Sequence, residues 1–393
     1  MRLALLTVGD ELLLGDVPNT NAAWLGRALA GVGGRVVLGL TVPDEVAAIV
    51  AALGAALAAA DGVVVTGGLG PTPDDLTWAA LTRLAGASLP VRGAAPPGAA
   101  WIPNPVGAVH GVRLTVGGRP VWAVPGVPAE MAAMVTAAVL PEVRAASGAV
   151  VSTRTLRVAL LGEAAVARRL AADRGFRVPD GVRLAFLPGP GETQVRLTAS
   201  GVDPAAVDRW LAPVLAAART ALGPAVYAEG ERSLAEVVHA ALRGQGASLA
   251  SAESFTGGML GAALTDPPGA SGTYRGGVTA YASEAKVRLL GVPAALLART
   301  GAVHPDVAAA MAAAVRDRLE ATYGVATTGV AGPGAQDGRP PGTVFVAVAG
   351  PGGVTAAGPR LAGSRAHIRA VGTVWALDLL RRVLAGHPPP GAD

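Results

Sequence analysis

Lys286 stands out in this sequence because it is the only lysine among 32 basic residues, and the other 31 (32 − 1) are arginines. Arginine can replace lysine wherever only a positive charge is needed, but its guanidinium stays protonated, whereas a lysine amine can lose its proton. A single retained lysine therefore predicts acid–base chemistry at this position. Chance survival of one solvated lysine is the alternative interpretation.

The residues around Lys286 predict a short helix over 284–290, with Ser283 as its N-cap and Gly291 at its end. Lys286 then lies in the first helical turn, where the positive end of the helix dipole lowers the pKa of an amine. Such an amine can take the proton of a serine hydroxyl and turn it into a nucleophile. Ser–Lys pairs are a known variant of the hydrolytic triad.

Three small-residue loops could supply the hydroxyl and bind a ligand: 253–258 (ESFTGG), 269–274 (GASGTY) and 327–334 (TTGVAGPG). Loops of this kind at strand ends are where open α/β sheets bind ligands. Glycine there lets main-chain amides approach a phosphate or carboxylate. Each loop alone is more typical of a simple turn, but together with the lone lysine they favour a site.

A further Gly-rich turn, TGGLGPTPDDLT over residues 66–77, predicts a phosphate site in the first third of the chain. Three glycines leave space for the phosphate at the start of the next helix: Gly67, Gly68 and Gly70. Two acidic residues in its first turn, Asp74 and Asp75, could hold a divalent cation beside that phosphate. Other carboxylates on loops at strand ends are Asp10, Glu11 and Glu130. Ordinary capping of the helix is the alternative interpretation.

The order of predicted strands and helices indicates an α/β fold in three parts. Residues 1–146 and 232–387 alternate strand with helix, which predicts two three-layer αβα domains with parallel sheets. Residues 150–229 instead predict a small α+β module that joins them.

Composition excludes several classes of protein. The longest apolar run, residues 46–60, is shorter than the roughly 20 residues that span a bilayer. No cysteine is present, which excludes disulfides and thiolate metal sites and fits a cytoplasmic location. The net charge is only +4 and no basic run is interleaved with aromatics, so we expect neither a membrane nor a nucleic acid as partner.

Several of these motifs resemble those of one family. GDELLLG, NTN, TGGLGPTPDDLT, NPVG and PGVPAEM resemble the N-terminal domain of the CinA (competence/damage-inducible) family, which is similar to molybdopterin-binding, MogA-like domains. AESFTGG, GGVTAYASEAKVRLLGV, GAV and TTGVAGPG resemble its C-terminal nicotinamide-nucleotide amidase domain. The resemblance covers nearly the whole chain, with a KH-like module in the middle.

The resemblance implies an enzyme of pyridine nucleotide (NAD) salvage. The C-terminal domain is expected to hydrolyse the carboxamide of nicotinamide mononucleotide to nicotinic acid mononucleotide and ammonia, without a cofactor. The N-terminal domain is expected to be an ADP-ribose pyrophosphatase that depends on a divalent metal, Mg²⁺ or Co²⁺. The resemblance to the family also implies a homodimer that binds small nucleotides.

Residue by residue, the resemblance makes Ser271 the nucleophile, in the family's Gly-Ser-Ser turn, and Lys286 the general base. Tyr281 would position or relay the proton, and Ser254 is the alternative nucleophile. The implied substrate-binding residues are Ser254, Thr256, Gly257, Gly258, Thr328, Gly329 and Arg365, the last for the 5′-phosphate. In the N-terminal domain the implied phosphate site is Gly67, Gly68, Gly70 and Thr72, and the implied metal ligands are Asp74, Asp75, Asp10 and Glu130.

The sequence also departs from the family. Phe255 stands where cysteine is usual, and the segment between Gly86 and Pro103 is short and lacks a basic-Gln-Ala motif, which predicts a weak or absent pyrophosphatase. The alternative function is a non-catalytic nucleotide- or pterin-binding protein associated with competence or DNA damage. The sequence leaves open the metal, the choice of serine and any coupling between the domains.

Overall fold

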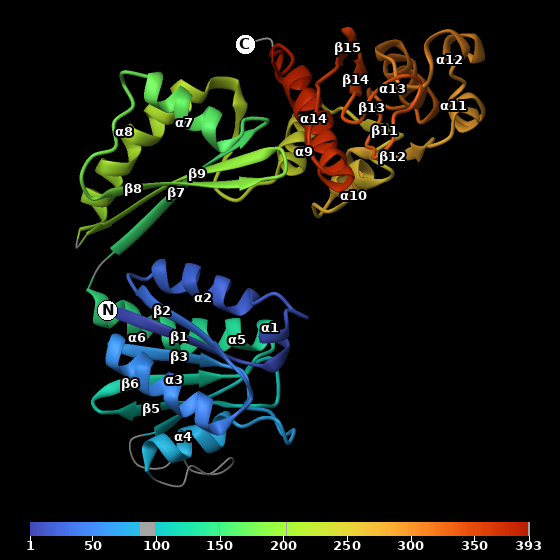
Figure 1. The fold of residues 1–393 in the computed structure, drawn as a ribbon. Helices are drawn as coiled ribbons and strands as arrows, with labels where there is room; N and C mark the ends of the chain where they lie inside the picture. Colours follow the sequence, from blue (N-terminus) through green and yellow to red (C-terminus); the bar gives the residue numbers. More distant parts are fainter. Residues whose placement is uncertain (87–98, 149, 202, 392–393) are drawn as a thin grey trace. The chain divides into compact units, whose positions relative to one another are not determined.

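The computed structural model describes residues 1–86, 99–148, 150–201 and 203–391 (Figure 1). It divides into two compact units, Met1–Thr153 with Thr198–Trp210 (unit 1) and Arg154–Leu197 with Leu211–Asp393 (unit 2), which we describe one at a time. Most of the segment with the shortened family motif, residues 87–98, lies outside the described residues. Within the described part of the chain, none of the helices has the length and apolar character needed to cross a bilayer.

Unit 1 is organised on a six-stranded sheet of order β2-β1-β3-β6-β5-β4. Its first four strands in that order are parallel, and β5 and β4 are antiparallel. The strands are β1 (Arg2–Val8), β2 (Arg35–Val42), β3 (Gly62–Thr66), β4 (Ala99–Ile102), β5 (Gly111–Val116) and β6 (Arg119–Val124). Parallel strands place their carboxyl ends at one edge, so the loops after β1, β3 and β6 meet there.

Helices cover both faces of this sheet, as a three-layer αβα fold requires. Alternate residues of β1 show why: Ala4 and Leu6 pack in the core with α3 and α4, whereas Leu3 and Leu5 pack in the other core with α2, α5 and α6. The helices are α1 (Asp10–Leu14), α2 (Thr20–Ala30), α3 (Val46–Ala59), α4 (Thr77–Ala85), α5 (Pro128–Met134), the π-helical turn η1 (Val135–Val139) and α6 (Leu140–Ser147).

The KH-like module is a four-stranded sheet of order β10-β7-β9-β8 with two helices (Figure 1). Its elements are β7 (Val150–Ala159), α7 (Glu163–Ala172), β8 (Val182–Gly189), β9 (Glu192–Gly201), α8 (Pro204–Leu222), the turn η2 (Gly223–Ala225) and β10 (Val226–Glu229). Burial alternates along β9, with Thr193, Val195 and Leu197 buried and their neighbours partly exposed. That period of two identifies one core-facing side of the sheet.

The C-terminal domain, also of three αβα layers, has a five-stranded sheet of order β12-β11-β13-β14-β15. The first three strands are parallel and the last two antiparallel. The strands are β11 (Leu249–Glu253), β12 (Tyr274–Thr279), β13 (Tyr323–Gly329), β14 (Val344–Gly350) and β15 (Gly353–Ala357). The helices are α9 (Leu234–Gly244), α10 (Met259–Thr265), the turn η3 (Ala270–Gly272), α11 (Ser283–Leu290), α12 (Ala294–Thr300), α13 (Pro305–Arg318) and α14 (Arg365–Ala385).

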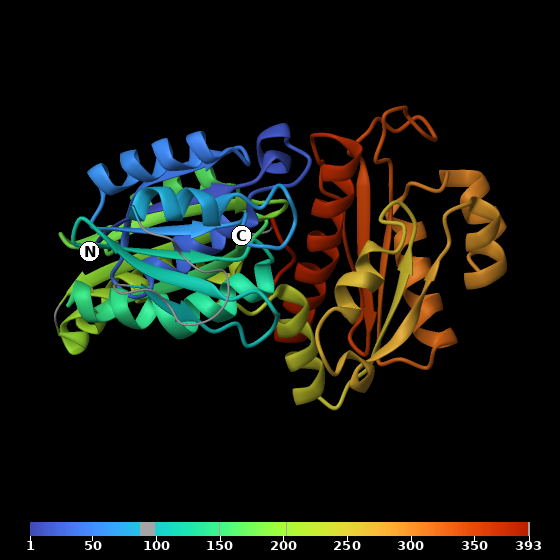
Figure 2. The same ribbon diagram turned by 90° about the horizontal axis from the view of Figure 1, so that it is seen from below.

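The two helical layers of this domain pack at different distances from the sheet. Figure 2 shows the sheet edge-on between the long red helix α14 and the orange helices of the other layer. The layer with α9 and α14 meets larger strand residues such as Leu249 and Val325. The layer with α13 meets alanines, among them Ala250, Ala326 and Ala347, so its backbone lies close to the strands.

The predicted αβα architecture is confirmed, but both sheets are mixed and not purely parallel, because hairpins add β5 and β4 to one and β14 and β15 to the other. The other differences are local. The loop after β1 contains the short helix α1, whose end at Gly15 is left-handed. Helix α3 begins at Val46, with Glu45 at its N-cap position. Ser283 is the first residue of α11 and not its cap. The sequence analysis did not recognise several short elements: β4, β5, β8, β10, β12, β15 and α12.

Replacing Gly324 of β13 by alanine should destabilise unit 2, because a Cβ there would lie 2.0 Å from the main-chain oxygen of Ala312 in α13. Neither backbone can move without shifting the layer, so we expect a loss of about 1–3 kcal/mol and a lower melting temperature. Gly352→Ala is the control, since nothing lies within 4 Å of its added Cβ. Equal melting temperatures of the two variants would contradict this account of the close α13 contact.

Candidate active site in the C-terminal domain

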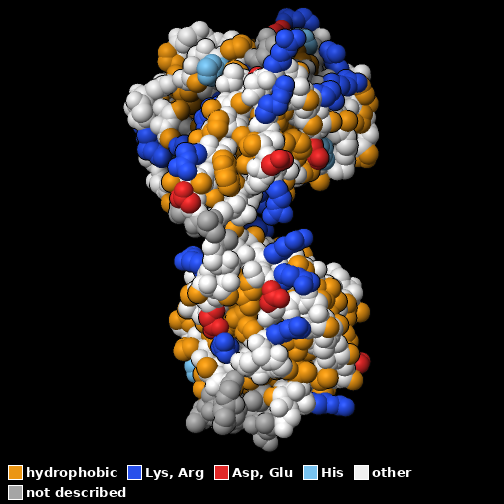
Figure 3. Space-filling model, turned by 90° about the vertical axis from the view of Figure 1, so that its left-hand side faces the viewer, with side chains coloured by type: hydrophobic (Ala, Val, Ile, Leu, Met, Phe, Trp, Pro, Cys, Tyr) orange, Lys and Arg blue, Asp and Glu red, His pale blue; other side chains and the backbone are white. Residues whose placement is uncertain are grey.

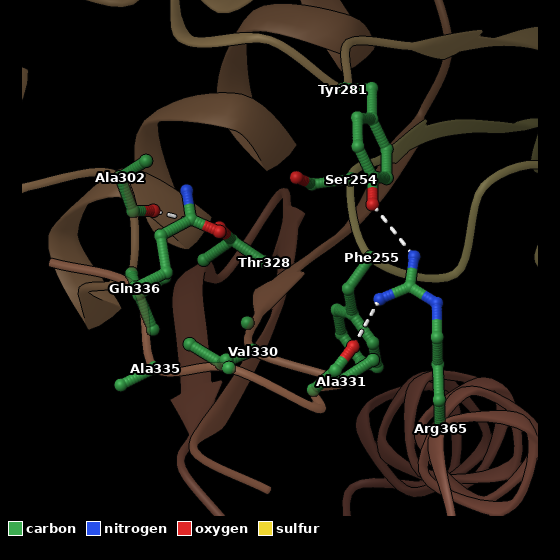
Figure 4. Close-up of a pocket in the computed structure, with 14 residues that line it drawn as sticks. Ser254, Phe255, Tyr281, Ala302, Thr328, Val330, Ala331, Ala335, Gln336 and Arg365 are labelled. Carbon is green, nitrogen blue, oxygen red and sulfur yellow. Dashed lines mark hydrogen bonds between the residues drawn. The ribbon is translucent and has the colours of Figure 1, made fainter. Parts of the chain in front are cut away.

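A pocket of about 250 Å³ opens at the carboxyl edge of β11, β12 and β13 (Figure 4). The loops after these strands form it, together with residues from the loop before α13 and the first residue of α14. Its lining residues are Ser254, Phe255, Tyr281, Ala302, Val303, Thr328, Gly329, Val330, Ala331, Gly332, Gly334, Ala335, Gln336 and Arg365. The pocket therefore lies where parallel sheets usually bind ligands.

Beneath Ser254, the amine of Lys286 is buried. Its Nζ donates to Ser254 Oγ at 3.0 Å, to the main-chain oxygen of Ala280 at 2.9 Å and to that of Tyr281 at 3.1 Å. The side chain is 1% exposed, so the basic side chains on the surface in Figure 3 are arginines. Burial lowers the pKa of Lys286 to about 8, although Asp337 and Glu284 act in the opposite direction.

The three partners of this amine are not equivalent. Carbonyl oxygens only accept, so the oxygens of Ala280 and Tyr281 always take an N–H from Lys286. Once the amine has lost its proton it has two N–H groups left, and these two carbonyls use both. Its lone pair then faces the Ser254 hydroxyl, which can donate. The geometry is that of a base held ready for one particular serine.

The predicted partner of Lys286, Ser271, is not at this site within the chain. Ser271 lies in η3, exposed, just before β12, whereas Lys286 follows β12. Strands β11 and β12 run parallel, with Leu249 beside Tyr274 and Glu253 beside Thr279. Ser271 is therefore at the opposite, amino-terminal end of the parallel strands. At about 3.3 Å per residue, the length of β12 places it roughly 20 Å from Lys286. The hydroxyl beside the amine belongs to Ser254, the alternative that the sequence left open.

The loop that carries Ser254 is fixed by its own residues, and some predicted ligand-binding groups have this structural role. Thr256 is completely buried and its hydroxyl bonds that of Thr327 at 2.8 Å. Gly257 and Gly258 adopt the left-handed conformation, with φ of 60° and 99°, which turns the chain into α10. None of these three lines the pocket. They shape the loop and do not face a substrate.

The remaining predicted residues do line the pocket. Thr328 donates its hydroxyl hydrogen to the oxygen of Ala302 at 2.7 Å, and Gly329 follows it. Arg365 is exposed at the start of α14, and its guanidinium donates to Tyr281 Oη at 2.8 Å and to the oxygen of Gly332 at 2.7 Å. Tyr281 thus accepts from Lys286 through its main-chain oxygen. It accepts from Arg365 through its hydroxyl (Figure 4).

Sequence reasoning missed part of the pocket wall. Phe255 and Val330 supply apolar surface, and Gln336 brings a carboxamide from the turn between β13 and β14 (Figure 4). Phe255 was noted only as a departure from the family. Gln336 lies in a turn without regular structure. Its place in a long loop after a strand is the one feature of the sequence that could have indicated a pocket residue.

In unit 1 a second cleft, of about 430 Å³, contains the predicted Gly-rich turn. Gly67 has φ of 103° and a Cβ there would lie 2.2 Å from the oxygen of Val8. Gly68 has φ of 65° and a Cβ there would lie 2.4 Å from Thr77 Oγ1. Gly70 lines the same cleft. This turn requires glycine at two positions because the chain passes close to β1 and α4.

The acidic residues of unit 1 mostly bind their own neighbours. Asp75 accepts from both the amide and the hydroxyl of Thr72, so Thr72 faces Asp75. Both Asp74 and Asp75 precede α4, which begins at Thr77, and are not in its first turn. Asp10 and Asp44 accept each other's main-chain N–H groups. Burial raises the pKa of the Asp44 carboxyl, and repulsion from Asp10, Glu11 and Asp74 adds to this.

Glu130 accepts from Asn104 Nδ2 at 2.6 Å and so holds the NPVG turn. Of the predicted ligands, Asp74, Asp75 and Glu130 line the cleft together with Glu11 and Asp44, and Asp10 lies against Asp44. Over the part of the chain that the structure describes, no three acidic or histidine side chains come together as a metal site. As these side chains stand they do not form a site for a divalent ion, and we derive no chemistry from one.

Comparison with known proteins assigns all three parts. Residues 231–384 match the model of the CinA C-terminal domain, 153–228 that of the damage-inducible protein CinA KH domain, and 4–145 that of a probable molybdopterin binding domain. A CinA-like protein of Frankia casuarinae is 47% identical, with 99% of this chain and 97% of that protein covered. One from Gemmatimonas aurantiaca is 40% identical, covering 98% and 97%.

Among solved structures, a competence-damaged protein (CinA) superfamily protein from Escherichia coli is 33% identical. The match covers 38% of this chain and 87% of that one, with a TM-score of 0.37. The full-length relatives and the three matched domains together decide the family. The chain belongs to the CinA family.

Proposed function

We propose that the C-terminal domain hydrolyses the carboxamide of nicotinamide mononucleotide to nicotinic acid mononucleotide and ammonia, with Ser254 as nucleophile and Lys286 as base. One observation carries the proposal: a buried amine with a pKa of about 8 lies 3.0 Å from the only serine hydroxyl among the residues that line the pocket. A carboxamide needs a nucleophile stronger than neutral water, and a serine beside a neutral lysine provides one.

The steps follow from this pair. The Lys286 amine takes the Ser254 proton while Oγ attacks the carboxamide carbon, and the resulting ammonium then protonates the departing nitrogen as the C–N bond breaks. Ammonia leaves and an ester on Ser254 remains. Water attacks this ester and gives its proton to the amine. The ammonium then returns a proton to Ser254 Oγ as the C–O bond breaks and the acid is released. The same lysine acts as base and acid in both halves.

The other pocket residues support a mononucleotide as substrate. Phe255 and Val330 offer apolar contact for a pyridine ring. The exposed guanidinium of Arg365 is a natural partner for a 5′-phosphate, since it keeps free N–H donors beyond those bound to Gly332 and Tyr281. Gly272 lies with Ser271 at the amino end of β12 and does not line the pocket, so its amide is not placed to stabilise an oxyanion there.

For unit 1 we propose only that its Gly-rich cleft binds a small molecule. The glycines at 67 and 68 and the volume of the cleft support this. The five carboxylates in its wall (Glu11, Asp44, Asp74, Asp75 and Glu130) disfavour a phosphate by itself, so a phosphate site there stays a prediction from the sequence. Hydrolysis of ADP-ribose would require a set of metal ligands, and the described carboxylates do not form one. A pyrophosphatase in unit 1 therefore stays a prediction from the sequence.

Replacing Ser254 by alanine should lower ammonia release from nicotinamide mononucleotide by at least about a thousandfold, because the attacking oxygen is removed. Ser271→Ala is the matched control and should stay within about twofold of the wild type. Steady-state ammonia assays on both purified variants decide between the serines. Loss of activity in Ser271→Ala alone would assign attack to Ser271, supplied by another copy of the chain. No ammonia from the wild-type protein would favour the non-catalytic alternative.

The rate should follow the protonation state of Lys286. Only the neutral amine can accept the serine proton, so kcat/KM should rise about tenfold per pH unit below pH 8 and level off above it. Measurement between pH 6.5 and 9.5 covers the transition. Activity that is independent of pH across this range, or that falls towards pH 9, is incompatible with Lys286 as the base.

Stability should report the same group independently of turnover. The pKa of Lys286 is about 8 in the folded protein and 10.5 as its ordinary value, so unfolding takes up a proton between these pH values. Wild-type unit 2 should therefore gain stability relative to Lys286→Met as pH rises from 8 to 10.5, by up to roughly 3 kcal/mol. Paired thermal melts at pH 7.5 and 10.5 test this. A melting-temperature difference that does not change with pH would refute the lowered pKa.

A further inference from the structure

Unit 2 contains a second cleft, of about 410 Å³, that the proposed reaction does not use. The KH-like module supplies one wall, with residues 160–162 and the hairpin between β8 and β9. The other wall consists of residues 359–361 and one side of α14, with His367, Val371 and Trp375. Its volume lies within the roughly 300–1,000 Å³ of small-molecule sites. It shares no lining residue with the pocket of Ser254.

The charged groups of this cleft favour an anion. Arg360 and His367 are exposed on the α14 side, and Arg360 uses one of its five N–H donors on Thr343 Oγ1 at 2.7 Å. The one carboxylate in the wall, Glu192, accepts from Tyr227 Oη at 3.0 Å and lies 3.9 Å from Arg157. Helix α7 also begins here, with Gly162 at its N-cap position, no side-chain cap and Glu163 in its first turn. The positive charge of the cleft therefore comes from Arg360, whose remaining N–H groups can bind an anion.

The rest of the wall is apolar and well defined. Trp375 is partly exposed in the cleft, next to Leu160, Leu361 and Val371. Leu160 adopts φ of 61°, a left-handed conformation that is costly for a leucine, and its N–H donates to the oxygen of Gly191 across the hairpin. An indole beside aliphatic side chains suits a planar ring. A cleft that suits both a planar ring and an anion is complementary to a nucleotide.

We propose that this cleft is a second ligand site, which binds a small organic phosphate with a planar ring, of the nucleoside monophosphate class. Arg360 and His367 hold the phosphate, and Trp375 with its aliphatic neighbours holds the ring. We further propose that occupancy of the cleft changes substrate binding at the Ser254 pocket; this second part rests on the proposed function.

The connection between the two sites is short. Leu361 lines the cleft and packs on the cluster of Phe255, Ala331, Val344 and Ile368, two of which line the Ser254 pocket. Its N–H donates to the oxygen of Gly342, whose own N–H donates to the oxygen of Val330 in the pocket wall. Helix α14 also carries Arg365 to the pocket and His367 to the cleft, two residues apart.

The binding test is calorimetric titration of the full chain with adenosine 5′-monophosphate, and with adenosine as the matched probe without phosphate. One equivalent of the monophosphate should bind to the wild type, and adenosine at least tenfold more weakly. The double variant Arg360→Gln/His367→Gln should raise the Kd of that equivalent at least tenfold. Arg299→Gln, an exposed arginine elsewhere in unit 2, and Arg365→Gln in the other pocket should not.

Two results would overturn the site: unchanged binding in the double variant, or loss of binding in Arg365→Gln alone, which would mean that the monophosphate occupies the Ser254 pocket. Melting curves of the double variant exclude unfolding as the cause of any loss. The coupling is tested by the KM for nicotinamide mononucleotide, which saturating monophosphate should change at least threefold in the wild type and not in the double variant. An unchanged KM would reject the coupling, and the titration does not depend on catalysis.

Discussion

The removal of one amine from water is the constraint on which the C-terminal site depends. Lys286 is 1% exposed, and the shift of its pKa from 10.5 to about 8 corresponds to roughly 3 kcal/mol against its charged form. The cost is tolerable because two carbonyl oxygens and one hydroxyl receive its N–H groups. Arginine could not use this place, since it would remain charged in it. The burial therefore explains why the chain keeps a lysine here and nowhere else.

The direction of three strands then decides what this amine can reach. Because β11, β12 and β13 are parallel, the residues at or after their carboxyl ends meet there: Ser254, Lys286 and Thr328. The antiparallel β14 returns the chain along β13, so the turn between them carries Gln336 to the same edge. The directions of these strands thus bring together a serine, a lysine and polar side chains that are far apart in sequence.

The sequence was sufficient to single out Lys286 and the small-residue loops and to predict the layered fold. A residue type that occurs once and the alternation of strand and helix can both be read without knowing the tertiary structure. Within the chain Ser271 does not lie beside Lys286, and the sequence did not indicate this for a physical reason. Strand β12 (YRGGVT) has two glycines and half-exposed residues, so it lacks an apolar run such as that of β3 (GVVVT). If β12 is recognised as a strand, Ser271 lies before it and Lys286 after it, so the two residues are at opposite ends of the strand. The contacts of the unit 1 carboxylates were equally hidden: Asp75 binds Thr72 and Glu130 binds Asn104, and no pattern in the sequence predicts these hydrogen bonds.

The serine loop shows how the site keeps its shape without depending on the substrate. Glu253 is 2% exposed, and its carboxylate accepts from the N–H groups of Gly258, Leu260 and Gly261. From the other side the Arg369 guanidinium donates to the oxygens of Phe255 and Thr256. The Glu253 carboxylate thus accepts from main-chain N–H groups after Ser254, and the Arg369 guanidinium donates to main-chain carbonyls. Charge-assisted hydrogen bonds of this kind are among the stronger ones in proteins. With its main chain held on both sides, the loop presents Ser254 Oγ to the pocket already aligned on Lys286, so little reorganisation is required when a substrate arrives.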